Sequence, residues 1–452
     1  MTLPFNQKAG QAPDYVHWFR HSSPYINAHR GKTFVIYLPG QALTTPEFDT
    51  LIHDISLLNS LGVKLVLVHG ANHQIDQAIQ EQAQTVIQHQ GHRVIESEHL
   101  PTLLAAVGQV RATLEAKLST GLINSPMSGA CIRVLSGNFV TAQPLGILNG
   151  EDLHYSGKVR RIDRESIQTI LAQHAIVLLS PMGYSPTGEI FSLSAQEVAS
   201  ECAMALDADK LIFFSRYPTS IKHRKLLAKR EMRVGGLQSL LQTWPPNTPL
   251  FRELNHLADA CRHGIQRNHL LDYTISGTLL MELFSLDGSG LMISNLAYEG
   301  IRQANIEDIG AIIELISPLE EAGQLIRRSR EKLEREIGHF SVIEKDGMLI
   351  GCSALYTHSN SPQSHLGEIA CIAIHPDYRN GGRGTLLLRA MEEQAQQQDL
   401  QACFVLTTQT AHWFLEQGFI EQALDSLPLE KKHLYNAQRK SKIFIKTFES
   451  VA

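Results

Sequence analysis

The residues best suited to chemistry lie between an apolar stretch at 369–374 and a helical pattern that starts at Thr385. Glycine adds no side-chain bulk, so a glycine-rich turn can point several backbone N–H groups at one anion. The first N–H groups of a helix and its dipole also favour a negative charge. We therefore predict a cradle for a nucleotide phosphate, held against the preceding strand. Its glycines and cations are Gly381, Gly382, Gly384, Arg379 and Arg383.

The order of strand, Arg-x-x-Gly-x-Gly loop and amphipathic helix resembles motif A of the GNAT family of acetyltransferases, which binds the pyrophosphate of acetyl-coenzyme A. The resemblance implies that acetyl-coenzyme A is the acetyl donor and that it contacts the strand as well as the cradle. Backbone N–H groups on such a strand can polarise the thioester carbonyl. The further contact residues implied in this way are Cys371, Ile372, Ala373, Ile374 and Thr385.

Acetyl transfer to an amine needs a base for the amine and a proton for the leaving thiolate. Glu368 is the only acidic residue in the segment before the cradle, so we predict that it is the base, directly or through water; an exposed strand end is the plainer alternative. Many acetyltransferases place a tyrosine acid where this chain has Phe414. Thr407, Thr408 or water is expected to supply the proton instead. We expect Cys371 to be structural, without a covalent acyl-enzyme.

The elements around the cradle follow the order of an acetyltransferase core. Helical patterns at 306–316 and 331–337 precede strand patterns at 340–344 and 348–356, which Asp346 and Gly347 join as a hairpin. The strand at 369–374, the cradle, its helix and a strand at 402–407 follow. We expect a GNAT-type α+β acetyltransferase domain over residues 300–452.

The first part of the chain has a different pattern. Strand patterns at 34–38, 63–68, 175–180 and 210–215 alternate with helical patterns, the first of which we expect to begin with Thr45 as its cap. The run at 63–68 is apolar apart from Lys64, as in a strand covered on both faces. Such alternation predicts an α/β fold, a mostly parallel sheet sandwiched by helices, which we place at residues 1–295.

This part resembles the amino-acid kinase family, and the acetylglutamate kinases within it, but it lacks their residues for phosphotransfer. Tyr37 stands where those kinases carry a lysine, and Ala71 and Asn72 replace glycines of their second phosphate-binding turn. Gln196 replaces an aspartate. Because a kinase must neutralise the charge of the transferring phosphate, we expect this domain to have lost kinase activity.

Residues 261–290 resemble the arginine-binding part of arginine-inhibited acetylglutamate kinases, which also carry an aromatic N-terminal helix like the one expected at 15–27. A guanidinium ligand needs a carboxylate and carbonyl oxygens in a fork arrangement. The resemblance implies an allosteric arginine site, although Leu291 replaces the threonine that usually follows its last glycine. The implied residues are His269, Glu282, Gly288 and Gly290.

Along nearly its whole length the chain closely resembles the bacterial N-acetylglutamate synthase family. This implies acetyl transfer to L-glutamate, the first step of arginine biosynthesis, with L-arginine as feedback inhibitor. The positions that match the family's glutamate-binding motif are Arg330, Arg439 and Ser441. Inhibition requires two states with different arginine affinity, and we expect a homo-oligomer, with a hexamer as the candidate size, linked through the N-terminal helix.

Charge, composition and residue spacing argue against a nucleic-acid-binding, membrane, secreted or metal-binding protein. A net charge of -5 offers no electrostatic attraction to nucleic acid or anionic membranes. No apolar run approaches the ~20 residues of a membrane span, and no signal peptide is evident, so we expect a cytoplasmic protein. The 6 cysteines lie far apart and the 21 histidines are scattered, which predicts reduced thiols and no metal site.

Three alternatives stay open at this point. The chain could be an acetylglutamate kinase whose lost groups are replaced by other residues. It could be a non-catalytic arginine sensor, which lack of coenzyme A binding would support. Its acetyltransferase part could also modify a different amine, such as a protein lysine, although the arginine-rich stretches at 327–330 and 435–442 favour an acidic small molecule.

Overall fold

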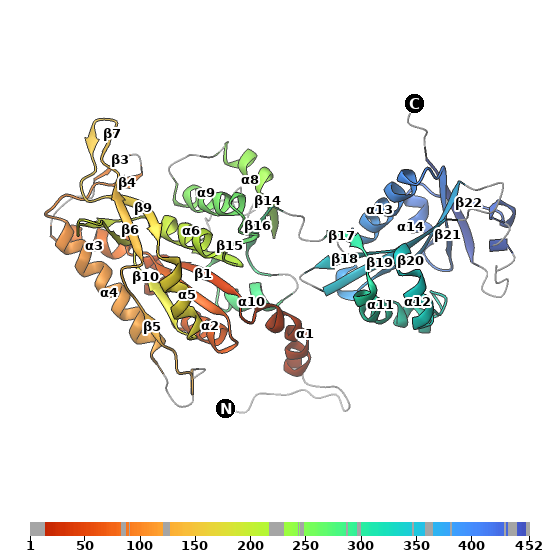
Figure 1. Cartoon of the computed structure of the whole chain (residues 1–452), viewed down its shortest axis with the longest axis horizontal. Helices are drawn as coiled ribbons and strands as arrows, with labels where there is room; N and C mark the ends of the chain where they lie inside the picture. The colour runs from red at the N-terminus through yellow and green to blue at the C-terminus, as the bar shows by residue number, and fades with distance from the viewer. Residues whose placement is uncertain are drawn as a thin grey trace. The chain divides into compact units, whose positions relative to one another are not determined.

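The computed structural model describes residues 14–82, 87–89, 91–120, 127–216, 230–242, 244, 248–285, 288–295, 300–345, 348–357, 365–379, 382–428, 431–432 and 441–448 (Figure 1). The chain divides into two compact units, Met1–Ala297 and Tyr298–Ala452. Each unit has its own sheet and its own apolar core.

The first unit is built on an 8-stranded sheet. Its strands, in spatial order, are β14 (Glu231–Arg233), β16 (Leu291–Ser294), β15 (Arg267–Asp272), β13 (Lys210–Ser215), β1 (Thr33–Leu38), β2 (Lys64–His69), β10 (Ile176–Leu179) and β5 (Val134–Leu135). Neighbouring strands pair in parallel, except that β15 and β16 are antiparallel. The predicted mostly parallel sheet is confirmed.

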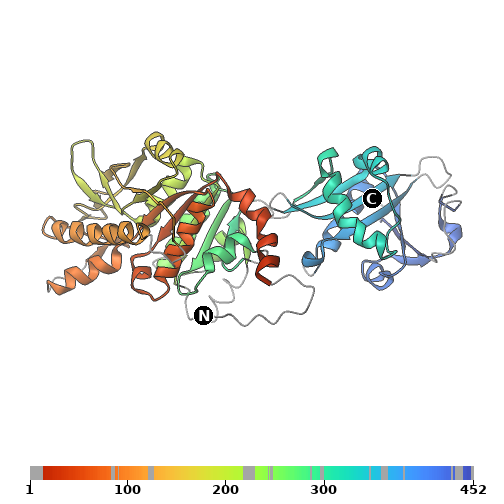
Figure 2. The same cartoon turned by 90° about the horizontal axis from the view of Figure 1, so that it is seen from below.

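Helices cover both faces of this sheet (Figures 1 and 2). Alternate residues of β1 belong to different cores: Val35 and Tyr37 to one, Phe34, Ile36 and Leu38 to the other. Because both faces are buried, the strand has no polar side, which explains the continuous apolar runs. One core includes α5 (Arg164–Ala172), α6 (Ala195–Leu206), α8 (Val234–Leu241) and α9 (Pro249–Arg262); the other includes α1 (Asp14–His29), α2 (Phe48–Ser60), α3 (Asn72–Glu81), α4 (Leu100–Leu118) and α10 (Thr278–Phe284).

Smaller elements complete the first unit. A 4-stranded sheet has the order β12 (Ile190–Ser192), β11 (Met182–Tyr184), β6 (Val140–Pro144) and β9 (Gly157–Ile162). Two short pairs are β3 (Gln88–His89) with β4 (His92–Arg93), and β7 (Ile147–Leu148) with β8 (Glu151–Asp152). The prediction that Thr45 caps α2 was wrong: the preceding residues form the 3₁₀ helix η1 (Gly40–Thr44), and the Thr45 hydroxyl donates to the Ala42 carbonyl oxygen at 2.8 Å.

The aromatic N-terminal segment forms α1, as expected. Its inner side packs on α10: Tyr25 is buried, and His29 Nε2 lies 2.8 Å from the Leu283 carbonyl oxygen. Its outer side exposes two aromatic rings, since Trp18 is 53% and Phe19 61% exposed.

The second unit has a 7-stranded sheet in the order β17 (Gly300–Gln303), β18 (Phe340–Lys345), β19 (Met348–Thr357), β20 (Leu366–Ile374), β21 (Ala402–Thr407), β23 (Lys442–Thr447) and β22 (Ile420–Gln422). Only β20 and β21 pair in parallel. One core includes α11 (Ile309–Glu321) and α12 (Arg330–Glu336), and another includes α13 (Arg383–Gln397) and α14 (Ala411–Glu416). The short 3₁₀ helices are η2 (Ile306–Asp308), η3 (Ile337–His339), η4 (Pro376–Tyr378) and η5 (Leu424–Ser426).

Among the described helices, none combines the length and the apolar character that crossing a bilayer requires. Within the same residues, no group of three or more histidine, cysteine, aspartate or glutamate side chains could hold a metal ion.

Candidate functional site

Two parallel strands of the second unit separate and leave a cavity between their ends. The pairing of β20 with β21 runs from Leu366 to Glu368 and stops there. Beyond Glu368, a cavity of about 460 Å³ is lined by residues 369–374 of β20 and by residues 405–410, which form the end of β21 and the turn after it. Among the residues that the structure describes, β20 has no strand partner on this side beyond Glu368, so its backbone groups there are available to a ligand.

A bulge in β20 lies within the stretch that lines this cavity. Between the pairs of Cys352 with Ala373 and of Ala354 with Ala370, β20 carries one residue more than β19. Cys371 takes up the difference with a φ of 56°, a left-handed conformation that is unfavourable for any residue other than glycine. Bulges of this kind are frequent next to active sites, where they redirect the strand.

The predicted phosphate cradle lies at the amino end of α13. Gly382 precedes the helix with a φ of 71°, so it needs the conformational freedom of glycine. A Cβ at Gly384 would lie 3.3 Å from the Trp413 ring. Gly382, Gly384, Thr385 and Arg379 all line the cavity, whereas Gly381 lies outside the described residues. The structure thus brings four of the predicted cradle residues together with Cys371, Ile372, Ala373 and Ile374 of β20.

Arg383 has a different position from the one expected of a cradle cation. Its Nη1 donates to the Tyr378 carbonyl oxygen at 3.0 Å, and its guanidinium lies over the Tyr378 ring at 5.3 Å. It is not among the residues that line the cavity. These contacts indicate that Arg383 fixes the turn between β20 and α13.

Glu368 lies where β20 and β21 begin to separate. Its side chain is 8% exposed, so the alternative of an exposed strand end was wrong. Lys431 Nζ lies 2.5 Å from Glu368 Oε2, a contact between segments far apart in the sequence. Glu368 does not itself line the cavity. A proton transfer from a substrate amine in the cavity to Glu368 would therefore need a water molecule or a movement of the Glu368 side chain.

Thr407 ends β21 and lies in the cavity wall with Thr408 and Phe414. Its Oγ1 accepts from the backbone N–H of Thr410 at 3.1 Å and lies 2.8 Å from Thr410 Oγ1. A hydroxyl that accepts from a backbone N–H keeps its own hydrogen for donation. When the Thr410 hydroxyl donates to Thr407, the Thr407 hydroxyl can give a proton or a hydrogen bond toward the cavity.

The Cys371 side chain is unsuited to covalent catalysis. Burial raises the pKa of its thiol to about 11, whereas the reactive form of cysteine is the thiolate. This geometry favours direct transfer within the cavity over a covalent acyl-enzyme.

The residues predicted to bind the acceptor are less well defined. Arg330 begins α12 with its side chain 74% exposed and 3.1 Å from Glu334. Ser441 directly precedes β23, and Arg439 lies outside the described residues. Sequence reasoning missed Arg328, whose buried Nε has no hydrogen-bond partner in the described part of the chain. The arginine-rich stretch itself was the signal, but only the fold shows that Arg328 is the half-buried arginine whose Nε is inaccessible to solvent.

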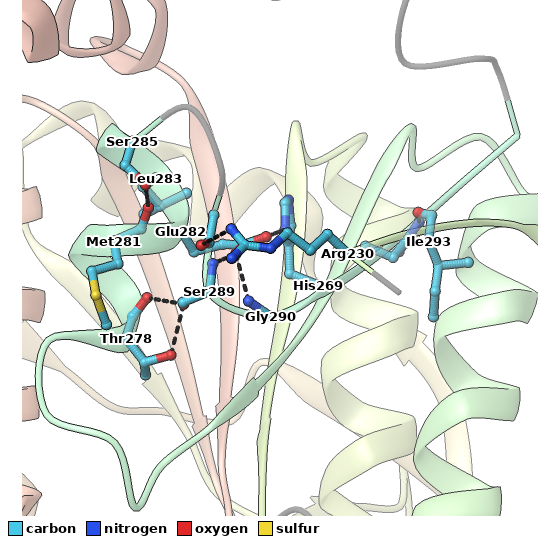
Figure 3. Close-up of polar contacts among 12 residues, drawn as sticks. Arg230, His269, Thr278, Met281, Glu282, Leu283, Ser285, Ser289, Gly290 and Ile293 are labelled. Atoms are coloured by element: carbon cyan, nitrogen blue, oxygen red, sulfur yellow. Dashed lines mark hydrogen bonds and ion pairs between the residues drawn. The ribbon is translucent and has the colours of Figure 1, made fainter. Parts of the chain in front are cut away.

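In the first unit, Glu282 is the centre of the predicted arginine site (Figure 3). Its side chain is 6% exposed and lies on α10. Its Oε1 is 2.7 Å from His269 Nδ1, and its Oε2 accepts from the backbone N–H groups of Ser289 and Gly290 at 2.6 and 2.8 Å. Burial alone would raise the pKa of the Glu282 carboxyl, but the hydrogen bond and charge of His269 and the two N–H groups lower it to about 2.

Close packing explains the two glycines of this site. A Cβ at Gly288, which has a φ of 62°, would lie 2.6 Å from Glu282 Oε2. A Cβ at Gly290 would lie 2.5 Å from the Leu270 carbonyl oxygen. Both distances are shorter than van der Waals contact, so a side chain at either position would displace the loop from Glu282. The structure brings all four predicted residues of this site together.

Arg230 also belongs to this site and was missed by sequence reasoning. Its side chain extends toward Glu282 and Ser289, and its Nη1 donates to the Gly288 carbonyl oxygen at 2.9 Å (Figure 3). The Arg230 guanidinium therefore already binds a carbonyl oxygen of the loop that was expected to bind the guanidinium of an arginine ligand. No local motif marks Arg230, because its partners lie about sixty residues later in the sequence.

Comparison with known proteins identifies two family domains in the chain. Residues 32–218 match the Amino acid kinase family, and residues 309–419 match the Acetyltransferase (GNAT) family. An amino-acid acetyltransferase from Pseudomonas fluorescens strain SBW25 is 48% identical over 434 residues, which cover 96% of this chain and 99% of that protein.

Two solved structures extend the similarity. N-acetylglutamate synthase from Neisseria gonorrhoeae, complexed with coenzyme A and L-arginine, is 34% identical and superimposes with a TM-score of 0.87, covering 96% of this chain and 99% of that one. The same enzyme complexed with coenzyme A and N-acetyl-glutamate covers the same shares at 34% identity, with a TM-score of 0.60. The two-domain organisation is therefore common to this chain and to these relatives.

Proposed function

This chain belongs to the amino-acid acetyltransferase family, and from that premise we propose that it makes N-acetyl-L-glutamate from acetyl-coenzyme A and L-glutamate. The observation that carries the proposal is the cavity between β20 and β21. It joins the amino end of α13, suited to a pyrophosphate, to a strand whose backbone groups face a ligand. Coenzyme A and N-acetyl-glutamate in the gonococcal enzyme support the choice of substrates.

The proposed reaction is direct attack of the substrate amine on the thioester. Glu368 takes one proton from the α-ammonium group, directly or through water, and the neutral amine then attacks the acetyl carbonyl. Backbone N–H groups of Cys371, Ile372 and Ala373 stabilise the oxyanion that forms. The carbon–sulfur bond breaks, Thr407 or a water molecule gives a proton to the thiolate, and the second proton that the nitrogen loses replaces the proton of that donor. Arg330, Arg439 and Ser441 remain the proposed anchors of the substrate carboxylates, and Gly381 remains a proposed coenzyme contact.

We propose further that L-arginine binds the first unit, over residues 1–295, and inhibits transfer in the second, over residues 300–452. The buried carboxylate of Glu282 and the loop carbonyl of Gly288 offer the two kinds of group that a guanidinium needs. L-arginine in the gonococcal complex supports this assignment. Feedback by arginine would place the reaction at the start of arginine biosynthesis, in the cytoplasm.

An oligomer is part of the proposal. The open outer side of α1, with Trp18 and Phe19 exposed, has the aromatic composition of subunit contacts. A homo-oligomer, with a hexamer as the candidate size, would bury these rings and give arginine two states to select between.

The experiment that tests these proposals measures free coenzyme A released from acetyl-coenzyme A with a panel of amino acids, each with and without arginine. Turnover with L-glutamate alone, suppressed by arginine, is the expected result. Turnover that arginine leaves unchanged would remove the inhibitor site from the proposal. Absence of turnover with every amino acid would contradict the catalytic assignment.

A further inference from the structure

The base assigned to acetyl transfer, Glu368, is in contact with a lysine from a remote segment of the second unit. Lys431 Nζ lies 2.5 Å from Glu368 Oε2, and the side chains of the lysine and the glutamate are 27% and 8% exposed. We propose that Lys431 is a positioning residue for acetyl transfer: its ammonium group keeps the Glu368 carboxylate ionised and fixes the direction of one of its oxygens. This inference rests on the proposed function, in which Glu368 is the base.

The carboxyl group of Glu368 has lost most of its contact with water. Moving an ionised carboxylate out of water is unfavourable unless a cation or hydrogen-bond donors take the place of the water. Without such groups a buried carboxylate binds a proton, and a protonated carboxyl cannot accept the proton of a substrate ammonium group. An ammonium group beside one carboxylate oxygen opposes that protonation. The ion pair therefore favours the form of Glu368 that the reaction needs, and Lys431 itself neither gains nor loses a proton.

A buried anchor brings the segment of Lys431 to the base. Leu427, which follows η5, is fully buried in an apolar cluster with Phe404. Phe404 is the residue of β21 that pairs with Glu368, and residues paired across neighbouring strands point their side chains to the same face of the sheet. Leu427 therefore attaches the chain after η5 to the face of the sheet that carries Glu368.

A tight turn then sets the position of Lys431. The backbone N–H groups of Lys431 and Lys432 both donate to the Pro428 carbonyl oxygen, at 2.9 and 3.0 Å. The side chains of the two lysines have different partners. Lys432 Nζ lies 3.6 Å from Asp425, whose side chain is 100% exposed. Because the ion pair of Lys432 is in solvent and that of Lys431 reaches a buried carboxylate, Lys432 provides a matched control on the same turn.

Other titratable groups face the same region. Tyr356 is paired with Glu368 across β19 and β20, and Cys371 lies further along β20. Burial raises the pKa of the Cys371 thiol to about 11 and raises the pKa of the Tyr356 hydroxyl above its ordinary value, so both are neutral near pH 7. The charged groups next to these two side chains are Arg328, Glu320 of α11 and Glu336 of α12. All of them are the same in the wild type and in a Lys431 variant, so a difference in pH dependence between the two proteins reports the loss of the ammonium group.

The test is the pH dependence of kcat for acetyl transfer to L-glutamate by the full chain. Lys431→Met keeps an unbranched side chain without the charge, Lys431→Arg keeps the charge, and Lys432→Met is the control. A carboxylate that loses a neighbouring cation binds a proton at a pH about 1–3 units higher. The pH of half-maximal kcat on the acid side should therefore rise by about one unit or more in Lys431→Met, which lowers kcat about tenfold below that pH. Lys431→Arg and Lys432→Met should keep a profile close to that of the wild type, and the KM for acetyl-coenzyme A should be the same in all four proteins.

A double variant separates positioning from a merely structural role. If Lys431 acts through Glu368, adding Lys431→Met to Glu368→Gln should lower kcat no further, because the group that the lysine serves is already absent. The double variant contains no unpaired charge from this ion pair, so it remains informative even if Lys431→Met alone does not fold.

An unchanged acid-side profile in folded Lys431→Met, or a further loss of kcat in the double variant, would overturn the inference. A shift as large in Lys432→Met as in Lys431→Met would overturn it as well. These results are distinguishable from failure of the proposed function, because in each of them the wild type still transfers the acetyl group to L-glutamate. A wild type without turnover would refute the proposed function and this inference together.

Discussion

Replacement of Glu282 by glutamine is expected to destabilise the first unit by about 3 kcal/mol at neutral pH. The pKa of the carboxyl is about 2 in the folded chain, against an ordinary value of 4.5. A difference of about 2.5 units, at 1.36 kcal/mol per unit, gives about 3 kcal/mol of stabilisation by the ionised form. Glutamine has nearly the same shape, but its amide hydrogens would face His269 Nδ1, which now lies 2.7 Å from Glu282 Oε1.

The sign of the pH dependence follows from the lowered pKa. A carboxyl with a lowered folded pKa stabilises the protein fully above about pH 4.5, and this stabilisation is lost as the pH falls toward 2. The glutamine variant lacks this contribution at every pH. The difference in the free energy of unfolding between the wild type and the Glu282→Gln variant should therefore be constant from pH 8 to about 5 and should become smaller below pH 5.

Urea unfolding of both proteins over this pH range measures the difference, with Glu151→Gln, at an exposed position of β8, as the matched control. Hydrogen exchange resolves its origin, because the Ser289 and Gly290 amides donate to Glu282 and should exchange faster in the variant. Equal free energies of unfolding at pH 7, with unchanged exchange of these two amides, would refute the assignment of Glu282 as a stabilising buried anion.

Four further outcomes are expected. Glu368→Gln should lower kcat by about 10²–10⁴ with unchanged coenzyme A affinity, as measured by single-turnover kinetics and calorimetry; a kcat near wild type would exclude Glu368 as the base. Thr407→Val should lower kcat about tenfold while Thr407→Ser retains it, and equal loss in both would exclude a role for the hydroxyl. Cys371→Ala should keep kcat within a few-fold, since the buried thiol is not a nucleophile; complete loss in a folded variant would contradict direct transfer. Arg230→Gln should lower the arginine concentration for half inhibition about fivefold, because the Gly288 carbonyl is released; weaker inhibition would show that Arg230 assists arginine instead.

The elements of the first unit were predictable because their signals are local. The predicted run at 63–68 is apolar except for Lys64, and the structure places it in β2, inside a parallel sheet with both faces covered. The start of α2 was not predictable in this way. Threonine before proline is a usual helix start, but here the preceding η1 uses Thr45 to close its own turn.

The candidate active site was predictable in part. The glycines and arginines just before α13 have the spacing of an anion-binding turn, which predicted the cradle, and most of them line the cavity. The bulge at Cys371 has no signal in the sequence, because a cysteine in a left-handed conformation is held there by pairing with β19 and not by its own preference. The burial of Glu368 against Lys431 depends in the same way on a distant segment.

The sequence by itself indicated the two-domain organisation, placed Tyr37 where the related kinases carry a lysine, and predicted the cradle and the residues around Glu282, since these follow from residue types at short spacing. Tertiary structure alone decided that Arg230 contacts the Gly288 loop and that the Nε atom of Arg328 is buried while Arg330 is exposed. The physical reason is that a charge acquires its role from its burial and its partners, and both are set by segments that are remote along the chain.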